Sequence, residues 1–179
     1  MQKTKFLFLD LEMTGLDARC ESIIEVAAVV TDAQLNPLAE PFEALIKPKP
    51  EYLAAMQPFV LDLHKKSGIL DEVEQHGQDL ALVYQAFLDY LAQFKFDPKN
   101  TYLAGNSIYK DREFLVAYMP KVLELLHYRL VDVSTLKTLV RLWMSEDAAF
   151  KKQGKHRALD DVYATIEELK RYRALLFKA

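Results

Sequence analysis

The sequence has little cysteine and no long apolar run, and each shortage excludes a class of protein. The single Cys20 cannot form an internal disulfide, which argues against a disulfide-stabilised secreted domain. No segment approaches the roughly 20 apolar residues that a membrane-spanning helix needs. The first residues contain neither the apolar region nor the cleavage site of a signal peptide. We therefore expect a cytoplasmic protein without a membrane segment.

The sequence also lacks an excess of charge of either sign. The formal net charge is −3 over 179 residues, so the chain has no broad basic surface with which to bind a long polyanion through many phosphates. A nucleic-acid partner, if there is one, should therefore be short. There is no internal repeat, low-complexity tract or linker, and 51% of the residues are hydrophobic. These features predict one globular domain over residues 1–179.

The apolar pattern predicts strands first and helices later. The short connections between the first three strands favour an antiparallel meander, and the later helices act as crossovers to two further strands. We expect an α/β fold with a mixed five-stranded sheet flanked by helices. The predicted strands cover residues 6–13, 23–30, 42–46, 102–105 and 130–133. The predicted helices cover residues 50–66 with a break near Pro58, 80–94, a segment through 114–118 stopped by Pro120, 135–144 capped by Ser134, and a last helix from about Ala158.

Two acidic residues end the first predicted strand. Asp10 and Glu12 follow an apolar run and are separated by one residue, so a strand places both on one face, about 6–7 Å apart along the chain. Two carboxylates at a buried strand end repel one another and lose hydration. A divalent metal ion is the natural compensation.

Three further residues extend this acidic pattern. Asp111 starts the helix after the fourth strand, where the preceding loop can carry it back over the end of the first strand. His156 and Asp161 are five residues apart and cannot share one helix face, so His156 is expected in a loop before the last helix. Helix phase favours Asp161 over the adjacent Asp160 only modestly.

Three motifs give the chain its resemblance to a known family. They are Asp10-Leu11-Glu12-Met13-Thr14-Gly15-Leu16, Gly105-Asn106-Ser107-Ile108 with Asp111-Arg112, and His156-Arg157-Ala158-Leu159-Asp160-Asp161. In their order and spacing they closely resemble the oligoribonuclease family of the DEDDh exonucleases. The resemblance extends from about residue 5 to the end of the chain. One departure is Phe59, where the family usually has tryptophan.

The resemblance implies a ribonuclease-H-like fold and a 3′→5′ exoribonuclease that degrades very short RNA, especially dinucleotides, to nucleoside 5′-monophosphates. It also implies two divalent metal ions, Mg²⁺ or Mn²⁺, held by Asp10, Glu12, Asp111 and Asp161. Asp10 would bridge both ions. His156 would act as the general base, since the histidine pKa lies near neutrality.

The resemblance further assigns residues to the substrate. Leu16 and His64 would contact the two bases. Ser107, Arg129 and Ser134 would hold the terminal 5′ phosphate, and Tyr128 would enter from the second subunit of a homodimer. Lys137, one helical turn beyond Ser134, could add charge there or simply lie on a solvated face.

Two alternative hypotheses remain open from the sequence. One is a related DEDDh exonuclease that acts on longer RNA or DNA 3′ ends, against which the low net charge counts. The other is a catalytically silent nucleic-acid-binding module of the same fold. The presence of a competent residue type at all five catalytic positions counts against the second alternative.

Overall fold

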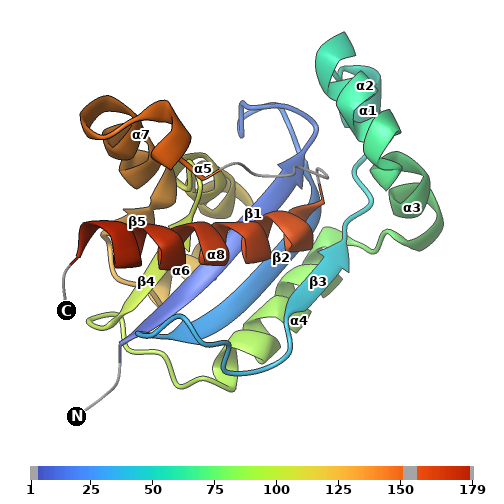
Figure 1. The fold of residues 1–179 in the computed structure, drawn as a ribbon. Coiled ribbons are helices and arrows are strands. Elements are labelled where there is room, and N and C mark those ends of the chain that lie inside the picture. The colour runs from blue at the N-terminus through green and yellow to red at the C-terminus, as the bar shows by residue number, and fades with distance from the viewer. Residues whose placement is uncertain (1–3, 151–156, 178–179) are drawn as a thin grey trace.

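The computed structural model of the protein describes residues 4–150 and 157–177 and centres on one mixed β-sheet. Its strands are β1 (Lys5–Met13), β2 (Ile23–Asp32), β3 (Phe42–Leu45), β4 (Thr101–Gly105) and β5 (Leu130–Asp132), in the order β3-β2-β1-β4-β5. The pairs β1–β2 and β2–β3 are antiparallel, whereas β1–β4 and β4–β5 are parallel. The predicted fold class is therefore confirmed (Figure 1).

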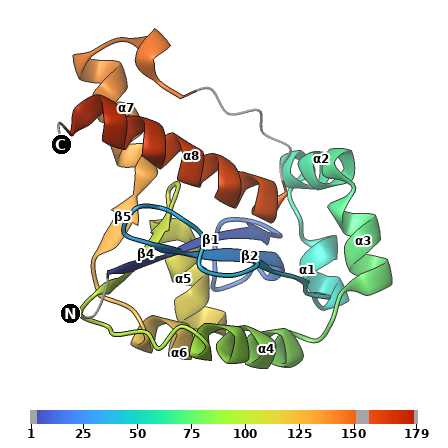
Figure 2. The same cartoon turned by 60° about the horizontal axis from the view of Figure 1, so that its bottom comes forward.

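Helices cover both faces of this sheet. Helices α4 (Leu80–Ala92), α5 (Tyr109–Tyr118) and α6 (Pro120–Glu124) lie on one face, and α8 (Ala158–Leu176) crosses the other (Figure 2). Helix α7 (Val133–Trp143) and the short 3₁₀ helix η1 (Glu146–Ala148) connect β5 to the segment before α8. None of the helices described here is long and apolar enough to span a membrane.

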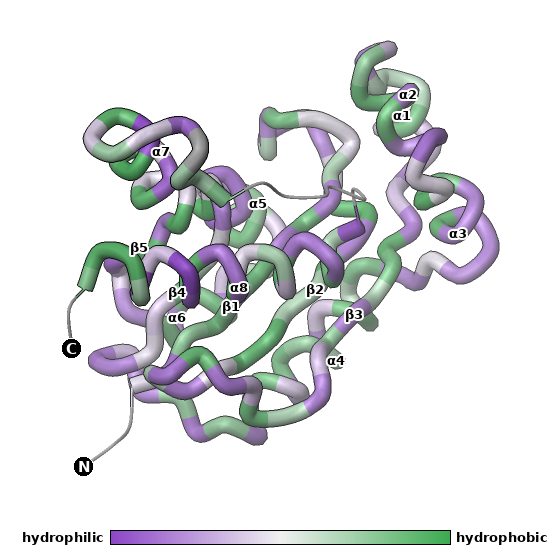
Figure 3. Tube along the Cα trace, in the orientation of Figure 1, coloured by the Kyte–Doolittle hydropathy of each residue, from purple (hydrophilic) through white to green (hydrophobic). Residues whose placement is uncertain are grey.

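The alternation of β1 residues assigns its acidic side chains to one face. Leu7, Leu9 and Leu11 pack in the apolar core that includes α4, α5 and α6, whereas Phe8 packs in the core beneath α8. Asp10 and Glu12 share the parity of Phe8, so they face the α8 side. The central strands are largely hydrophobic along their length (Figure 3). Their apolar burial keeps the part of β1 that carries Asp10 and Glu12 in place.

Three helices form a separate arm that extends past one end of the sheet. These are α1 (Pro50–Ala54), α2 (Pro58–Ser67) and α3 (Ile69–His76), and residues 50–76 are called the arm below (Figures 1 and 2). The break before Pro58 is confirmed, but α3 was not predicted. Gly68 is left-handed, with φ at 76°, and separates α2 from α3. Only Ile69 and Val73 of α3 are buried, which is too short a pattern to reveal a helix.

Two helix boundaries differ from the prediction for simple reasons. Pro120 begins a new helix, α6, as well as ending the region of α5, because proline fits the first turn of a helix. Ser134 does not cap α7. The cap is Asp132, whose carboxylate accepts a hydrogen bond from the Ser134 backbone N–H at 2.9 Å. The last helix begins at Ala158, as predicted.

Candidate metal centre and adjoining pocket

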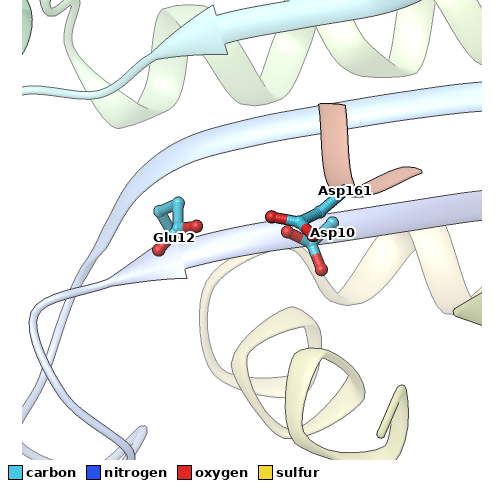
Figure 4. A group of neighbouring side chains, drawn as sticks. All are labelled: Asp10, Glu12 and Asp161. Carbon is cyan, nitrogen blue, oxygen red and sulfur yellow. The ribbon is translucent and has the colours of Figure 1, made fainter. Parts of the chain in front are cut away.

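Three carboxylates meet where β1 leaves the sheet. Asp10 and Glu12 come from β1 and Asp161 from the first turn of α8, and one oxygen of each lies within 4.8 Å of the others. Figure 4 shows Asp161 projecting from α8 toward Asp10, with Glu12 further along the strand. The grouping of Asp161 with the β1 pair agrees with the prediction. Asp160 is exposed.

Asp111 completes the acidic group from the other side of β1. Its side chain is buried, and its Oδ1 accepts a hydrogen bond of 2.9 Å from the backbone N–H of Leu11, the residue between Asp10 and Glu12. The close approach of this segment to β1 depends on Gly105 at the end of β4. A Cβ atom added at Gly105 would lie 2.8 Å from the carbonyl oxygen of Leu9.

The crowding of these carboxylates changes their proton affinity. Burial first, and then the nearby charges of Glu25, Asp161 and Asp111, together raise the pKa of Glu12 to about 7, against the lowering effect of Arg157. Burial also raises the pKa of Asp111 to about 7, against the lowering effect of the Leu11 N–H bond. The site therefore favours any positive charge that can approach its oxygens.

These residues fit a divalent metal ion. The donor set offers only carboxylate oxygens, which are the ligands that Mg²⁺ and Mn²⁺ prefer. One oxygen from each of three carboxylates already lies within 4.8 Å of the other two, so these residues could hold a metal ion. The acidic cluster therefore supports divalent-metal binding, in keeping with the expected cofactor class. His156, the predicted general base, lies outside the described residues.

A cavity of about 680 Å³ adjoins the carboxylates. Glu12 lines it together with Leu16 from the β1–β2 connection and Phe59 and His64 from α2. Leu16 and Phe59 are 69% and 77% exposed, so two large apolar side chains stand at its walls without a partner from the core. The volume is in the range of small-molecule binding sites, and the wall composition suits a flat aromatic group.

His64 is buried yet incompletely hydrogen-bonded. Its Nε2 lies 2.8 Å from the carbonyl oxygen of Met13 and must donate to it, since a carbonyl only accepts. Its Nδ1 is buried without a hydrogen-bond partner and lies 3.9 Å from Glu12 Oε2. An unsatisfied buried nitrogen is costly. Since Nε2 carries the ring proton, Nδ1 is an acceptor, and a hydroxyl group that donates to it would satisfy it.

Ser107 and Ser134 come together at the carboxyl ends of β4 and β5. The backbone N–H of Ser107 lies 3.0 Å from both Asp132 Oδ1 and Ser134 Oγ, and the two hydroxyl oxygens are 3.4 Å apart. Ser107 has a positive φ of 49°, and in this conformation its N–H is directed toward Asp132 and Ser134. Asn106 holds the Ser134 hydroxyl in place, because its Oδ1 accepts a hydrogen bond from Ser134 Oγ.

Arg129 and Tyr128 lie at the other end of β5. Arg129 precedes the strand and Ser134 follows it, so the three strand residues separate them by about 10 Å of extended chain. The Arg129 guanidinium instead lies 5.4 Å from the centre of the Tyr128 ring, and both side chains are exposed. The structure thus joins Ser107 with Ser134 but does not bring Arg129 to them in the described contacts.

Lys137 belongs to a buried network and is not simply on a solvated face. Its ammonium lies 3.3 Å from Glu168, a carboxylate with no exposed surface. Glu168 also accepts hydrogen bonds from Asn106 Nδ2 and the Tyr172 hydroxyl. The charge of Lys137 is therefore largely matched within the protein.

The sequence analysis missed four residues that shape this region, namely Glu25, Asn106, Arg157 and Glu168. Glu25 and Glu168 carry a signal that could have been used, since each is a carboxylate within an otherwise buried stretch of β2 or α8. A charge at such a position requires partners. Those partners come from distant segments, which no local pattern identifies.

Comparisons with known proteins agree with this geometry. The family model RNase_T, described as Exonuclease, matches residues 7–169. The chain is 42% identical over 176 residues to the mitochondrial oligoribonuclease of Homo sapiens, covering 97% of this chain and 74% of that protein. It is also 42% identical over 176 residues to the oligoribonuclease of Hydrogenovibrio crunogenus, covering 98% and 95%. A probable oligoribonuclease of Schizosaccharomyces pombe is 38% identical, covering 96% and 68%.

Solved structures support the fold assignment alone. Exonuclease I from Methylocaldum szegediense aligns with a TM-score of 0.75 at 22% identity, and a zinc-bound complex of Escherichia coli exonuclease I with single-stranded DNA aligns at 0.72 and 22%. In both cases 98% of this chain is covered but only 41% of the larger chain. The fold, the acidic cluster and the full-length sequence similarity lead to one conclusion: the chain belongs to the oligoribonucleases of the exonuclease family.

Proposed function

We propose that this oligoribonuclease removes nucleoside 5′-monophosphates from the 3′ end of very short RNA, with dinucleotides as its preferred substrates. The observation that carries this proposal is that Glu12 belongs both to the carboxylate cluster and to the wall of the cavity. A 3′-terminal nucleoside in the cavity would therefore have its phosphodiester next to the cluster. We also take residues 1–179 to act as a single exonuclease domain and to work in the cytoplasm.

The carboxylates hold the cofactor in this proposal. Glu12 and Asp161 would bind one divalent ion, Asp10 would bridge two, and Asp111 would support the second directly or through water. When bound, two such ions supply an activated water and stabilise the leaving oxygen of an in-line displacement. The four carboxylates offset the charge of the two ions, so that a phosphate can approach without net repulsion.

His156 would take the proton from the attacking water. It directly precedes Arg157, the N-cap residue of α8. A neutral imidazole is suited to this task near neutral pH, since its ordinary pKa lies in that range. Asp161, five residues later, remains on the helix as a ligand.

The arm and the β1–β2 connection would bind the 3′ nucleoside. Leu16 and Phe59 offer apolar surfaces against which a base can stack, and Phe59 does so where the family usually has a larger ring. The free Nδ1 of His64 suits a ribose hydroxyl, because Nδ1 accepts when Nε2 carries the ring proton and the hydroxyl can pair with it by donating its hydrogen. This pairing would favour RNA over DNA if the hydroxyl is the 2′ one.

The other end of a dinucleotide would meet Ser107 and Ser134. The Ser107 hydroxyl can donate to a 5′ phosphate, and the Ser134 hydroxyl, 3.4 Å away, could do so after releasing its hydrogen bond to Asn106 Oδ1. Tyr128 and Arg129 lie together at the exposed start of edge strand β5. Tyr128 would approach this group from a second subunit, and Arg129 would reach the phosphate only by turning away from the Tyr128 ring. A phosphate enclosed in this way would stop the substrate after two nucleotides.

We further propose that the enzyme is a homodimer. Leu142, Trp143 and Met144 form a consecutive apolar run at the end of α7, and they are 72%, 76% and 50% exposed. Exposed apolar runs of this kind commonly mark interfaces between proteins. A second copy of the chain is the occupant that would also supply Tyr128.

The substrate class can be tested with labelled RNAs of two to ten nucleotides, assayed with Mg²⁺ and with EDTA. We expect the 5′-phosphorylated dinucleotide to give the highest kcat/KM and no turnover in EDTA.

Asp10→Asn should abolish nearly all activity while leaving the fold intact, because loss of one anionic ligand affects both ions. Faster cleavage of the ten-nucleotide RNA, or normal turnover by folded Asp10→Asn, would contradict the proposal.

Glu12→Gln should stabilise the metal-free protein in a pH-dependent way. The folded-state pKa of Glu12 is raised to about 7 from 4.5, so the native state loses stability as the pH rises between these values. The full penalty, about 3 kcal/mol, is present only above pH 7. In EDTA, the variant should melt at a higher temperature than wild type at pH 8 and at nearly the same temperature at pH 4.5. Equal melting at both pH values would refute this.

Replacing the base should affect turnover more than metal affinity. We expect His156→Ala to lower kcat by about 10²–10⁴-fold, the usual range for a general base. Calorimetric titration with Mn²⁺ should give nearly unchanged binding, because the histidine is not a ligand. Asp160→Asn serves as the control and should change neither quantity. An unchanged kcat for His156→Ala, with chemistry rate-limiting, would point to a different base.

Trp143→Glu should convert the dimer into monomers at micromolar concentration, because it puts a charge in the middle of the exposed apolar run. Analytical ultracentrifugation measures this directly. Activity on the 5′-phosphorylated dinucleotide should fall together with dimer content, as the partner's contribution is lost. Leu82→Glu is a matched control, since Leu82 is 64% exposed on α4, away from this run. If the Trp143→Glu protein were still a dimer, the end of α7 would not be part of the dimer interface.

A further inference from the structure

Arg157 lies where three parts of the molecule meet. Its Nε and one terminal nitrogen lie 3.1 and 2.9 Å from the same oxygen of Glu25 on β2. The other oxygen of Glu25 accepts a hydrogen bond of 2.9 Å from the backbone N–H of Ala158. Glu25 is fully buried, so its position is fixed by the sheet. This carboxylate therefore anchors both the Arg157 side chain and the first residue of α8.

The remaining side of the guanidinium is directed at the arm. Its second terminal nitrogen lies 2.8 Å from Glu72 on α3. The terminal nitrogen that binds Glu25 lies 4.0 Å from Glu43 on β3, which is a longer contact. A guanidinium is planar, so two bonds to Glu25 fix the direction of the third donor. The contact with Glu72 consequently has a defined direction, unlike most pairs between long surface side chains.

The described contacts between the arm and the rest of the molecule also include apolar packing and a histidine hydrogen bond. Ile69 and Val73 pack with Ile24 in a small apolar cluster, and His64 donates to the carbonyl oxygen of Met13. The cavity wall formed by Phe59 and His64 belongs to the arm, whereas Asp161 belongs to the first turn of α8. Arg157 thus connects the element that carries a metal ligand with the element that lines the nucleoside cavity.

We propose that Arg157, through Glu72, is a positioning residue that sets the distance between the arm and the metal centre. The inference rests on the proposed function, because the distance matters only if one substrate contacts both. An arm held closer or further away would change how the 3′ nucleoside is bound. It would not change the metal ligands, since Glu25 keeps α8 in place without Glu72.

Glu72→Gln isolates this link. The Glu72 side chain is 44% exposed, so the substitution removes one charge without leaving a cavity. Glu74→Gln is a matched control on the same helix, with an exposed side chain and only its backbone carbonyl in a hydrogen bond to Lys47. Glu72→Lys, with Glu74→Lys as its control, is the stronger form, because it places a cation opposite Arg157.

Steady-state kinetics on the 5′-phosphorylated dinucleotide with Mg²⁺ and amide hydrogen exchange provide two independent measurements. For Glu72→Gln we expect KM to rise about two- to fivefold, the range for one partly exposed ion pair, while kcat stays within a factor of two. Exchange across residues 50–76 should accelerate by a similar factor, and exchange in β1 and β2 should not. Glu72→Lys should give larger changes of the same kind, and both Glu74 variants should resemble wild type.

Unchanged KM together with unchanged exchange in the arm would overturn the inference, as would a fall in kcat with no change in KM. Failure of the proposed function looks different. If the wild-type protein does not cleave short RNA, the kinetic comparison is lost but the exchange measurement still decides whether Glu72 holds the arm.

Discussion

The structure depends on keeping four carboxylates close together at the end of one buried strand. Asp10 and Glu12 are placed there by β1, Asp111 by α5 and Asp161 by α8. Mutual repulsion and lost hydration oppose this arrangement, as the raised pKa of Glu12 records. The two apolar cores on either side of the sheet oppose that repulsion, because each fixes one of the helices that carries a carboxylate.

Other buried carboxylates in the same region are treated differently. Glu25 is matched by Arg157 and an amide N–H, and Glu168 by Lys137, Asn106 and the Tyr172 hydroxyl. Each has a cation from the protein itself and enough donors for both oxygens. Glu12, by contrast, has a histidine nitrogen 3.9 Å away and keeps a raised pKa. The chain thus neutralises Glu25 and Glu168 with its own cations, whereas the raised pKa of Glu12 leaves that carboxylate suited to an external cation.

The sequence was sufficient for features with a local cause. The five strands, the shared face of Asp10 and Glu12 and the start of α8 follow from periodicity and turn residues. Helix α3 was missed because only Ile69 and Val73 are buried. The role of Asp132 as the cap of α7 was missed because Asp132 and Ser134, two residues apart, are both good caps. The partners of Glu25 depend on tertiary packing, which local patterns do not contain.

The low net charge and the positions of the proposed substrate contacts together bear on the length of substrate that the protein would favour. A chain with a formal charge of −3 cannot gain much affinity from each additional phosphate of a longer strand. In the proposed function its binding energy comes from a few contacts, on Leu16 and Phe59 for the 3′ nucleoside and on Ser107 and Ser134 for the 5′ phosphate. Those contacts would act together only if the arm and the ends of β4 and β5 stay at a fixed separation. Preference for a short substrate would then be a property of that separation, which the anchoring of α8 by Glu25 and of the arm by Glu72 would maintain.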